Sequence, residues 1–170
     1  MADVKDNIVL IGMPGAGKST LGIVLAKILN KNFVDADIVI QNQCDKTLQK
    51  LIDAMGPEGF IEIENQILRD LDASNSVIAT GGSAIYSEEA MEHLGEIGTI
   101  IYLKISYDTL KDRLSDFDER GVVLKGGVSM SLRDLYDERI PLYEKYADIT
   151  VNVDDLSITG AARKVASVVE

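Results

Sequence analysis

The sequence predicts an α/β protein with three αβα layers, in which helices cover both faces of a five-stranded parallel sheet. Two observations support this prediction. Short apolar runs of strand length alternate with segments of helical period along the whole chain. The first run, at residues 8–11, is a continuous stretch of isoleucine, valine and leucine, which is typical of a strand buried on both faces. Ligands of such a sheet collect at the carboxyl ends of its strands.

The predicted elements follow one another from the first strand onward. Residues 18–29 carry apolar side chains at helical spacing, so the first helix is expected there. Runs of β-branched and aromatic residues predict the other strands, and apolar residues at helical period predict the other helices. The strands are expected at 33–35, 77–80, 99–103 and 149–153, and the helices at 38–54, 58–71, 88–94, 107–114, 132–146 and 158–169. No repeat or linker divides the chain, so residues 1–170 are predicted to form a single domain.

Composition excludes several classes of function. The chain has 170 residues and a formal charge of −11, which argues against holding nucleic acid or an anionic membrane by general electrostatics. Its single cysteine, Cys44, and single histidine, His93, leave no internal disulfide and no zinc cluster of the His and Cys type. The acidic start and the short first apolar run resemble neither a signal peptide nor a membrane span. We therefore expect a cytoplasmic protein whose partner is a small molecule.

A glycine-rich loop follows the first predicted strand directly. Residues 12–19 read Gly-Met-Pro-Gly-Ala-Gly-Lys-Ser, the full G-x-x-x-x-G-K-[ST] pattern. Glycines let successive N–H groups turn inward around phosphate oxygens, and the following helix adds its positive end. Lys18 is expected to reach the β and γ phosphates of ATP, and the Ser19 hydroxyl to bind Mg²⁺. A tight strand-to-helix turn is the alternative. The predicted nucleotide-binding residues are Gly12, Gly15, Ala16, Gly17, Lys18, Ser19 and Thr20.

Two carboxylates stand at the end of the second predicted strand. Asp35 and Asp37 alternate along an extended segment, so their side chains should share one side near the phosphate loop. One of them could act on Mg²⁺ through water, and the other could accept the proton of an attacking hydroxyl. Helix capping by Asp37 is the structural alternative. The third predicted strand runs into a glycine turn at residues 81–82, where a ligand can approach the backbone, although a simple turn explains it equally well.

In order and spacing, the motifs resemble those of the shikimate kinase family, within the nucleoside-monophosphate-kinase-like P-loop NTPase fold. The resemblance covers nearly the whole chain. It rests on the phosphate loop, the F-x-D-x-D strand end at 33–37, the G-F-x-x-x-E motif at 59–64, the glycine turn, and the R-x-P-L-Y motif at 139–143 followed by Ala-Asp. By this resemblance, Asp37 would hold and deprotonate the acceptor hydroxyl. Arg139 would bind the substrate carboxylate, and Gly82 and Ser83 would line the substrate site.

The resemblance also implies roles on the nucleotide side. Asp35 would assist Mg²⁺, Arg113 would stack near adenine, and Arg120 would act in catalysis, together with Lys18, from a mobile lid at about residues 116–130. The glycines of that segment support a mobile cover that excludes water, and an ordinary surface loop is the alternative. Taken alone, without the pattern, Arg113 and Arg139 would be assigned to solvated helix faces.

One departure from the family pattern concerns the acceptor side. The family carries an arginine after the phenylalanine of the G-F-x-x-x-E motif, and this chain has Ile61, beside Glu62. A charged hydrogen bond to a carboxylate contributes about 1.5 to 3 kcal/mol, so its loss should weaken shikimate binding roughly ten- to a hundredfold. Lys125 or Arg69 could supply the missing cation. Ser83 replaces the third glycine of the family's turn, and Gly121 replaces the proline after the lid arginine.

The sequence thus predicts an ATP-dependent small-molecule kinase that uses Mg²⁺ and acts as a monomer. Conversion of shikimate to shikimate 3-phosphate, a step of aromatic amino acid biosynthesis, is the expected reaction. Two alternatives stay open: a kinase of the same fold acting on gluconate, homoserine or another polyol, and a nucleotide-binding protein that has lost catalysis.

Overall fold

A five-stranded parallel sheet forms the centre of the computed structural model, which describes residues 5–114 and 131–170. Its strands are β1 (Asn7–Ile11), β2 (Asn32–Asp35), β3 (Ser76–Ala79), β4 (Gly98–Lys104) and β5 (Ile149–Asn152). They lie in the order β2-β3-β1-β4-β5, and each neighbouring pair is parallel. The predicted number and direction of the strands are confirmed.

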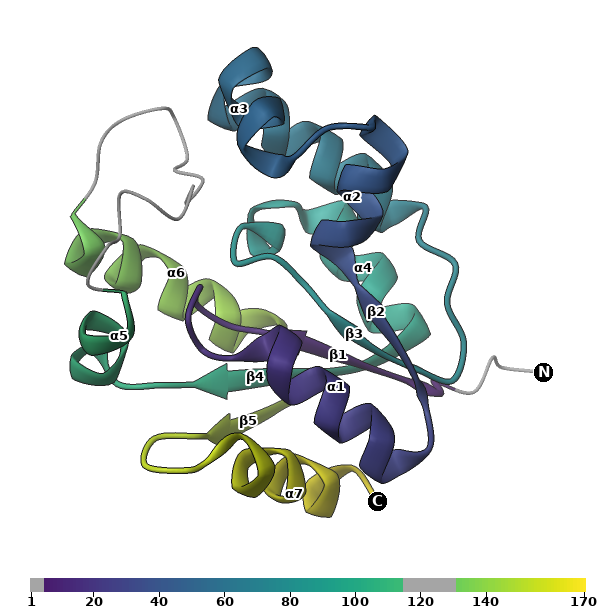
Figure 1. Cartoon of the computed structure of the whole chain (residues 1–170), viewed down its shortest axis with the longest axis vertical. Helices are drawn as coiled ribbons and strands as arrows, with labels where there is room; N and C mark the ends of the chain where they lie inside the picture. The colour runs from purple at the N-terminus through teal and green to yellow at the C-terminus, as the bar shows by residue number, and fades with distance from the viewer. Residues whose placement is uncertain (1–4, 115–130) are drawn as a thin grey trace.

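Helices cover both faces of this sheet (Figure 1). Along the chain they are α1 (Lys18–Leu29), α2 (Ala36–Cys44), α3 (Leu48–Arg69), the 3₁₀ turn η1 (Ala84–Tyr86), α4 (Glu88–Ile97), α5 (Tyr107–Arg113), α6 (Leu132–Tyr146) and α7 (Ile158–Val169). Helices α1 and α7 pack side by side on one face, and α4 and α6 contact β4 from the other. The predicted αβα layering is confirmed. None of the described helices combines the length and apolarity needed to cross a membrane.

Strand β1 lies at the centre of the sheet. It pairs with β3 on one edge and β4 on the other, and all of its residues are buried. Its first residue, Asn7, is a buried polar residue with a full set of partners. The Asn7 side-chain amide donates to the carbonyls of Ala73 and Ile97, and its oxygen accepts from the Ser76 N–H at 2.9 Å. A buried amide satisfied in this way ties the segments entering β3 and β4 to the start of β1. The phosphate-loop end of β1 is therefore held on a rigid frame.

The segment between β2 and β3 differs from its prediction. A single helix was expected at 38–54, but α2 ends at Cys44 and α3 begins at Leu48. Asp45 adopts the left-handed conformation (φ 51°) that ends α2, and the Thr47 hydroxyl then accepts a hydrogen bond from the Lys50 N–H. The break predicted between 54 and 58 exists as a kink within α3 at Gly56, whose φ is 73°.

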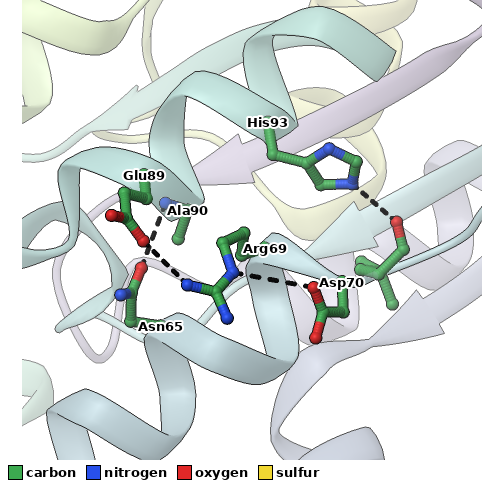
Figure 2. A network of polar contacts seen from close by, with 7 residues as sticks. Asn65, Arg69, Asp70, Glu89, Ala90 and His93 are labelled. Carbon is green, nitrogen blue, oxygen red and sulfur yellow. Dashed lines mark hydrogen bonds and ion pairs between the residues drawn. The ribbon is translucent and has the colours of Figure 1, made fainter.

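The end of α3 is tied to α4 by polar contacts on the outside of the molecule. Figure 2 shows the Arg69 guanidinium between the carboxylates of Asp70 and Glu89, with an Nη1–Oε2 distance of 2.9 Å to Glu89. Nearby, His93 Nε2 lies 2.7 Å from the carbonyl oxygen of Leu71, so the single histidine has a structural role. These contacts occupy the Arg69 side chain.

Candidate active site

A cavity of about 600 Å³ opens at the carboxyl ends of β1, β2 and β3, where ligands of a parallel sheet are expected. It is the size of a small-molecule site. The residues that line it are Pro14, Gly15, Gly17, Lys18, Ser19, Thr20, Asp37, Leu48, Ile52, Phe60, Glu64, Thr80, Gly81, Gly82, Ser83, Arg113 and Arg139. The cavity therefore brings together the phosphate loop, the strand-end acids and the glycine turn, three features that lie far apart in the sequence.

The phosphate loop has the backbone conformations that its glycines permit. Gly15 and Gly17 have φ values of 88° and 89°, in the left-handed region that favours glycine, and Gly17 directly precedes α1. Amides at the start of α1 thus face the cavity together with the positive end of the helix. Gly12 and Ala16 are buried within the loop, where the Ala16 N–H donates to the Met13 carbonyl at 3.0 Å.

Lys18 is the buried cation of this loop. Its Nζ donates to the carbonyls of Gly12 at 2.7 Å and Met13 at 2.9 Å. Burial lowers the pKa of the Lys18 amine to about 8, and the nearby Asp37 carboxylate acts in the opposite direction. The amine is still mostly charged at pH 7, and its positive charge lies in a poorly solvated position. An anionic phosphate in the cavity would therefore interact strongly with it.

Ser19 and Asp35 form a pair of oxygen ligands at the edge of the cavity. The Ser19 hydroxyl donates to Asp35 Oδ2 at 2.9 Å, so the two groups predicted to serve Mg²⁺ lie together. A hydroxyl and a carboxylate are hard oxygen donors that suit Mg²⁺, an ion that usually keeps several waters and binds phosphates. The residues present therefore fit the ion that the sequence predicts.

Asp35, and not Asp37, caps helix α2. Asp35 Oδ1 accepts the Asp37 N–H at 3.0 Å, whereas Asp37 lies in the first turn and lines the cavity. The alternative that gave Asp37 the capping role is therefore wrong. Burial raises the pKa of the Asp37 carboxyl above its ordinary value, and the Asp35 carboxylate adds to the effect. A carboxylate of raised pKa is a stronger base toward a hydroxyl.

Arg139 approaches the glycine turn from helix α6. The side chain is 1% exposed, so the assignment of this residue to a solvated face is wrong. Its Nε donates to the Tyr86 hydroxyl at 3.2 Å, and the guanidinium carbon lies 5.2 Å from the centre of the Tyr86 ring. A β-carbon on Gly82 would lie 2.7 Å from Arg139 Nη1, so the absence of a side chain there makes room for the guanidinium. The Tyr143 hydroxyl donates to the Gly82 carbonyl at 2.8 Å and holds the turn in place.

Arg113 reaches the phosphate loop from the end of α5. Its Nη1 donates to the Gly15 carbonyl at 3.0 Å, and it lines the cavity instead of projecting into solvent. Thr20 lines the same side of the cavity, next to Ser19. The predicted roles of Arg120, Lys125 and the lid fall on residues outside the described part of the chain.

The acceptor side of the cavity contains an acid whose role the sequence prediction missed. Glu64 is 1% exposed, and its Oε1 accepts a hydrogen bond from the Ser83 hydroxyl at 2.7 Å. Burial raises the pKa of Glu64 to about 7, while the Ser83 hydrogen bond acts in the opposite direction. The signal was present in the sequence, because Phe60, Glu64 and Leu68 recur at four-residue spacing on one face of α3, and all three are buried. An acid within such an apolar row is unusual.

Ile61 lies near this acid on α3, and its side chain packs elsewhere. It is half-buried against a small apolar cluster that contains Ile40, Leu51 and Phe60, and it is absent from the described lining of the cavity. Arg69, held by Glu89, is also absent from that lining, so it does not supply the cation that Ile61 replaces. Within the described lining, the cations are Lys18, Arg113 and Arg139.

Comparison with known proteins places these features in one family. A sequence model of shikimate kinase matches residues 14–170. The chain is 36% identical to the shikimate kinase of Mannheimia succiniciproducens, over 98% of this chain and 96% of that protein, and 35% identical to that of Vibrio parahaemolyticus over 98% and 97%. Among solved structures, shikimate kinase from Acinetobacter baumannii in complex with shikimate matches with a TM-score of 0.86 at 30% identity, over 98% of this chain and 94% of that one. The Aquifex aeolicus enzyme matches with a TM-score of 0.81 at 30% identity, over 96% and 95%.

Proposed function

Because the chain belongs to the shikimate kinase family, we propose that it transfers the terminal phosphoryl group of ATP to shikimate, giving shikimate 3-phosphate. The observation that carries this proposal is that a phosphate-binding half and a hydroxyl-activating half share one cavity. Lys18 of the phosphate loop and Asp37 of α2 both line it, close enough for each to shift the other's pKa.

The phosphate loop and Lys18 would hold the donor. Backbone N–H groups at the start of α1 bind phosphate oxygens, and the Lys18 amine stabilises the negative charge of the phosphoryl group in transfer. When bound, Mg²⁺ neutralises further phosphate charge, and Ser19 with Asp35 is the pair that would hold it. Arg113 lies beside Gly15, in position to contact the nucleotide.

Asp37 and Arg139 would hold the acceptor. The Asp37 carboxylate accepts the proton of the attacking hydroxyl, and its raised pKa suits this transfer. The Arg139 guanidinium pairs with the carboxylate of the acceptor, and its contacts with Tyr86 orient it before the substrate arrives. The glycine turn at 81–82 lets the acceptor ring approach the backbone between these two side chains.

The Asp37→Asn variant tests the chemical role of this carboxylate. We expect magnesium–ADP binding, measured by calorimetry, to be retained, and kcat for shikimate phosphorylation to fall by roughly 10²- to 10⁴-fold, because a general base contributes about that much. Asp45→Asn is the matched control, since Asp45 is exposed at the other end of α2 and Asn also tolerates its left-handed conformation. Full kcat in Asp37→Asn would show that Asp37 is not the base.

One observation favours a different acceptor. Ile61 packs into an apolar cluster, and the neighbouring cavity wall is formed by the apolar residues Leu48, Ile52 and Phe60. Arg139 would then be the main carboxylate anchor, and a kinase acting on gluconate, homoserine or another polyol stays a candidate. Phosphorylation assays with ATP, Mg²⁺ and a panel of these alcohols decide between them. Absent turnover of shikimate, with robust turnover of another alcohol, would reject the first proposal.

The expected location and assembly complete the proposal. We propose a cytoplasmic monomer with a small molecule as its partner, which fits a site built from one chain. The monomeric state is checked by light scattering of the purified protein.

A further inference from the structure

The acceptor wall of the cavity contains a carboxyl oxygen without a partner. Glu64 lines the cavity from helix α3, and its Oε1 is occupied by the Ser83 hydroxyl. Its Oε2 is shielded from solvent and has no hydrogen-bond partner among the residues that the structure describes. A buried polar atom left unpaired costs about 1–3 kcal/mol, so such atoms call for an explanation. One explanation is a ligand hydroxyl that forms the missing hydrogen bond with Oε2.

The position of this oxygen relates it to the catalytic carboxylate. A β-carbon on Gly81 would lie 2.8 Å from Glu64 Oε2 and 3.0 Å from Asp37 Oδ1. Two acids on different helices, α2 and α3, thus converge over one glycine of the turn. The terminal torsion of a glutamate side chain is soft, so a small rotation suffices to turn Oε2 toward a group that enters the cavity.

Burial and a facing acid favour the neutral form of Glu64. Burial is the largest cause of the raised pKa, and the facing carboxylate of Asp37 also disfavours a second negative charge. The Ser83 hydrogen bond and the facing cations Arg139 and Lys18 act in the opposite direction, and the pKa of Glu64 is still raised to about 7. Because Oε1 already accepts from Ser83, the proton of the neutral carboxyl belongs on Oε2, which makes this atom a hydrogen-bond donor.

We propose that Glu64 is a specificity-determining residue that contacts the acceptor, hydrogen-bonding through Oε2 to the hydroxyl adjacent to the one that Asp37 deprotonates. The site then selects a vicinal diol: one hydroxyl on Asp37, the next on Glu64, and the carboxylate on Arg139. An acceptor without the second hydroxyl leaves Oε2 unpaired in the complex, so the site discriminates against such analogues. This inference rests on the proposed kinase function and names the acceptor chemistry that it requires.

Two proteins and two acceptors test this contact: wild type and Glu64→Leu, each measured with shikimate and with an analogue that lacks one hydroxyl. Glu64→Leu removes the hydrogen-bonding group at similar size, and the analogue of shikimate in which hydrogen replaces the 4-hydroxyl removes its partner. For shikimate, we expect Glu64→Leu to raise KM about tenfold, the effect of one lost hydrogen bond, with KM for ATP unchanged. For the analogue, wild type should already show the raised KM, and the variant should add no further change.

Two control variants separate a lost contact with the acceptor from a general disturbance of the site. Glu62→Gln, exposed two residues away on α3, should leave both KM values unchanged. Because Leu could disturb the turn through Ser83, Glu64→Gln is measured as well: it keeps an acceptor for Ser83 and a donor at the second position, and should restore most of the affinity for shikimate. Equal KM increases for the two acceptors in Glu64→Leu, or no increase for either, would overturn the inference. If the wild-type protein phosphorylates neither acceptor, the proposed function itself fails.

Discussion

Replacing Glu64 by glutamine should change how the stability of the protein depends on pH. Glu64 is 1% exposed, and burial raises its pKa from 4.5 to about 7. In the unfolded chain the same carboxyl titrates at its ordinary value. Between these two pKa values the folded state binds the proton more tightly than the unfolded state, so the stability of the wild-type protein falls as pH rises.

The magnitude follows from the shift in pKa. A pKa unit corresponds to about 1.4 kcal/mol, so the whole shift corresponds to a loss of about 3 kcal/mol in the free energy of unfolding. This stability is fully present below pH 4.5 and is lost as pH rises through 7. About 2 kcal/mol of the loss falls between pH 5.5 and 8, a range that avoids the isoelectric point near 4.5. Gln carries no titrating proton, so Glu64→Gln should lack this component.

Urea denaturation of wild type and Glu64→Gln at several pH values between 5.5 and 8 measures the difference directly. The free energies of unfolding should diverge as pH rises, with the variant becoming the more stable of the two by about 2 kcal/mol relative to the difference at pH 5.5. Lys18 and Asp37 titrate in both proteins, so their contributions largely cancel in the difference between the two free energies of unfolding. Glu62→Gln, at an exposed site, should follow the wild-type curve. Parallel curves for wild type and Glu64→Gln would show that Glu64 ionises without a burial cost, and the argument for its neutral form would fall.

Two glycine substitutions test the geometry of the turn and of the sheet. Gly82→Ala should raise KM for shikimate at least tenfold, because its β-carbon would lie 2.7 Å from Arg139 Nη1 and displace the carboxylate anchor. The same β-carbon would lie 2.8 Å from Pro14 Cδ of the phosphate loop, so ADP affinity by calorimetry should fall as well. An unchanged KM would show that the Arg139 guanidinium is not displaced or does not hold the acceptor. Gly98→Ala should lower the free energy of unfolding by about 1–3 kcal/mol in urea, because its β-carbon would lie 2.8 Å from the Asn7 carbonyl oxygen of the central strand. Gly95→Ala, with only ordinary contact at 3.6 Å, is the control and should be neutral or stabilising.

Local patterns in the sequence were enough to predict the phosphate loop. The phosphate loop lies within eight consecutive residues between one strand and one helix, so its geometry is determined by glycine conformations and the helix start. The alternation of strand and helix likewise predicted the parallel sheet, because periodicity is a property of neighbouring residues. The break at Asp45 and Thr47 was missed because apolar spacing continues across it, although a threonine before an apolar segment is a common start of a helix.

The acceptor half depended on contacts between distant segments. Burial of Arg139 requires Tyr86 and the glycine turn to meet α6, more than fifty residues further along the chain. The convergence of Glu64 and Asp37 over Gly81 requires α2, α3 and the end of β3 to pack together. The sequence by itself determined the alternation of strands and helices and the position of the glycine-rich loop between β1 and α1, because those depend on residues close in the chain. How far the pKa values of the buried acids shift was decided only by tertiary packing, because desolvation and nearby charges depend on everything that surrounds a group.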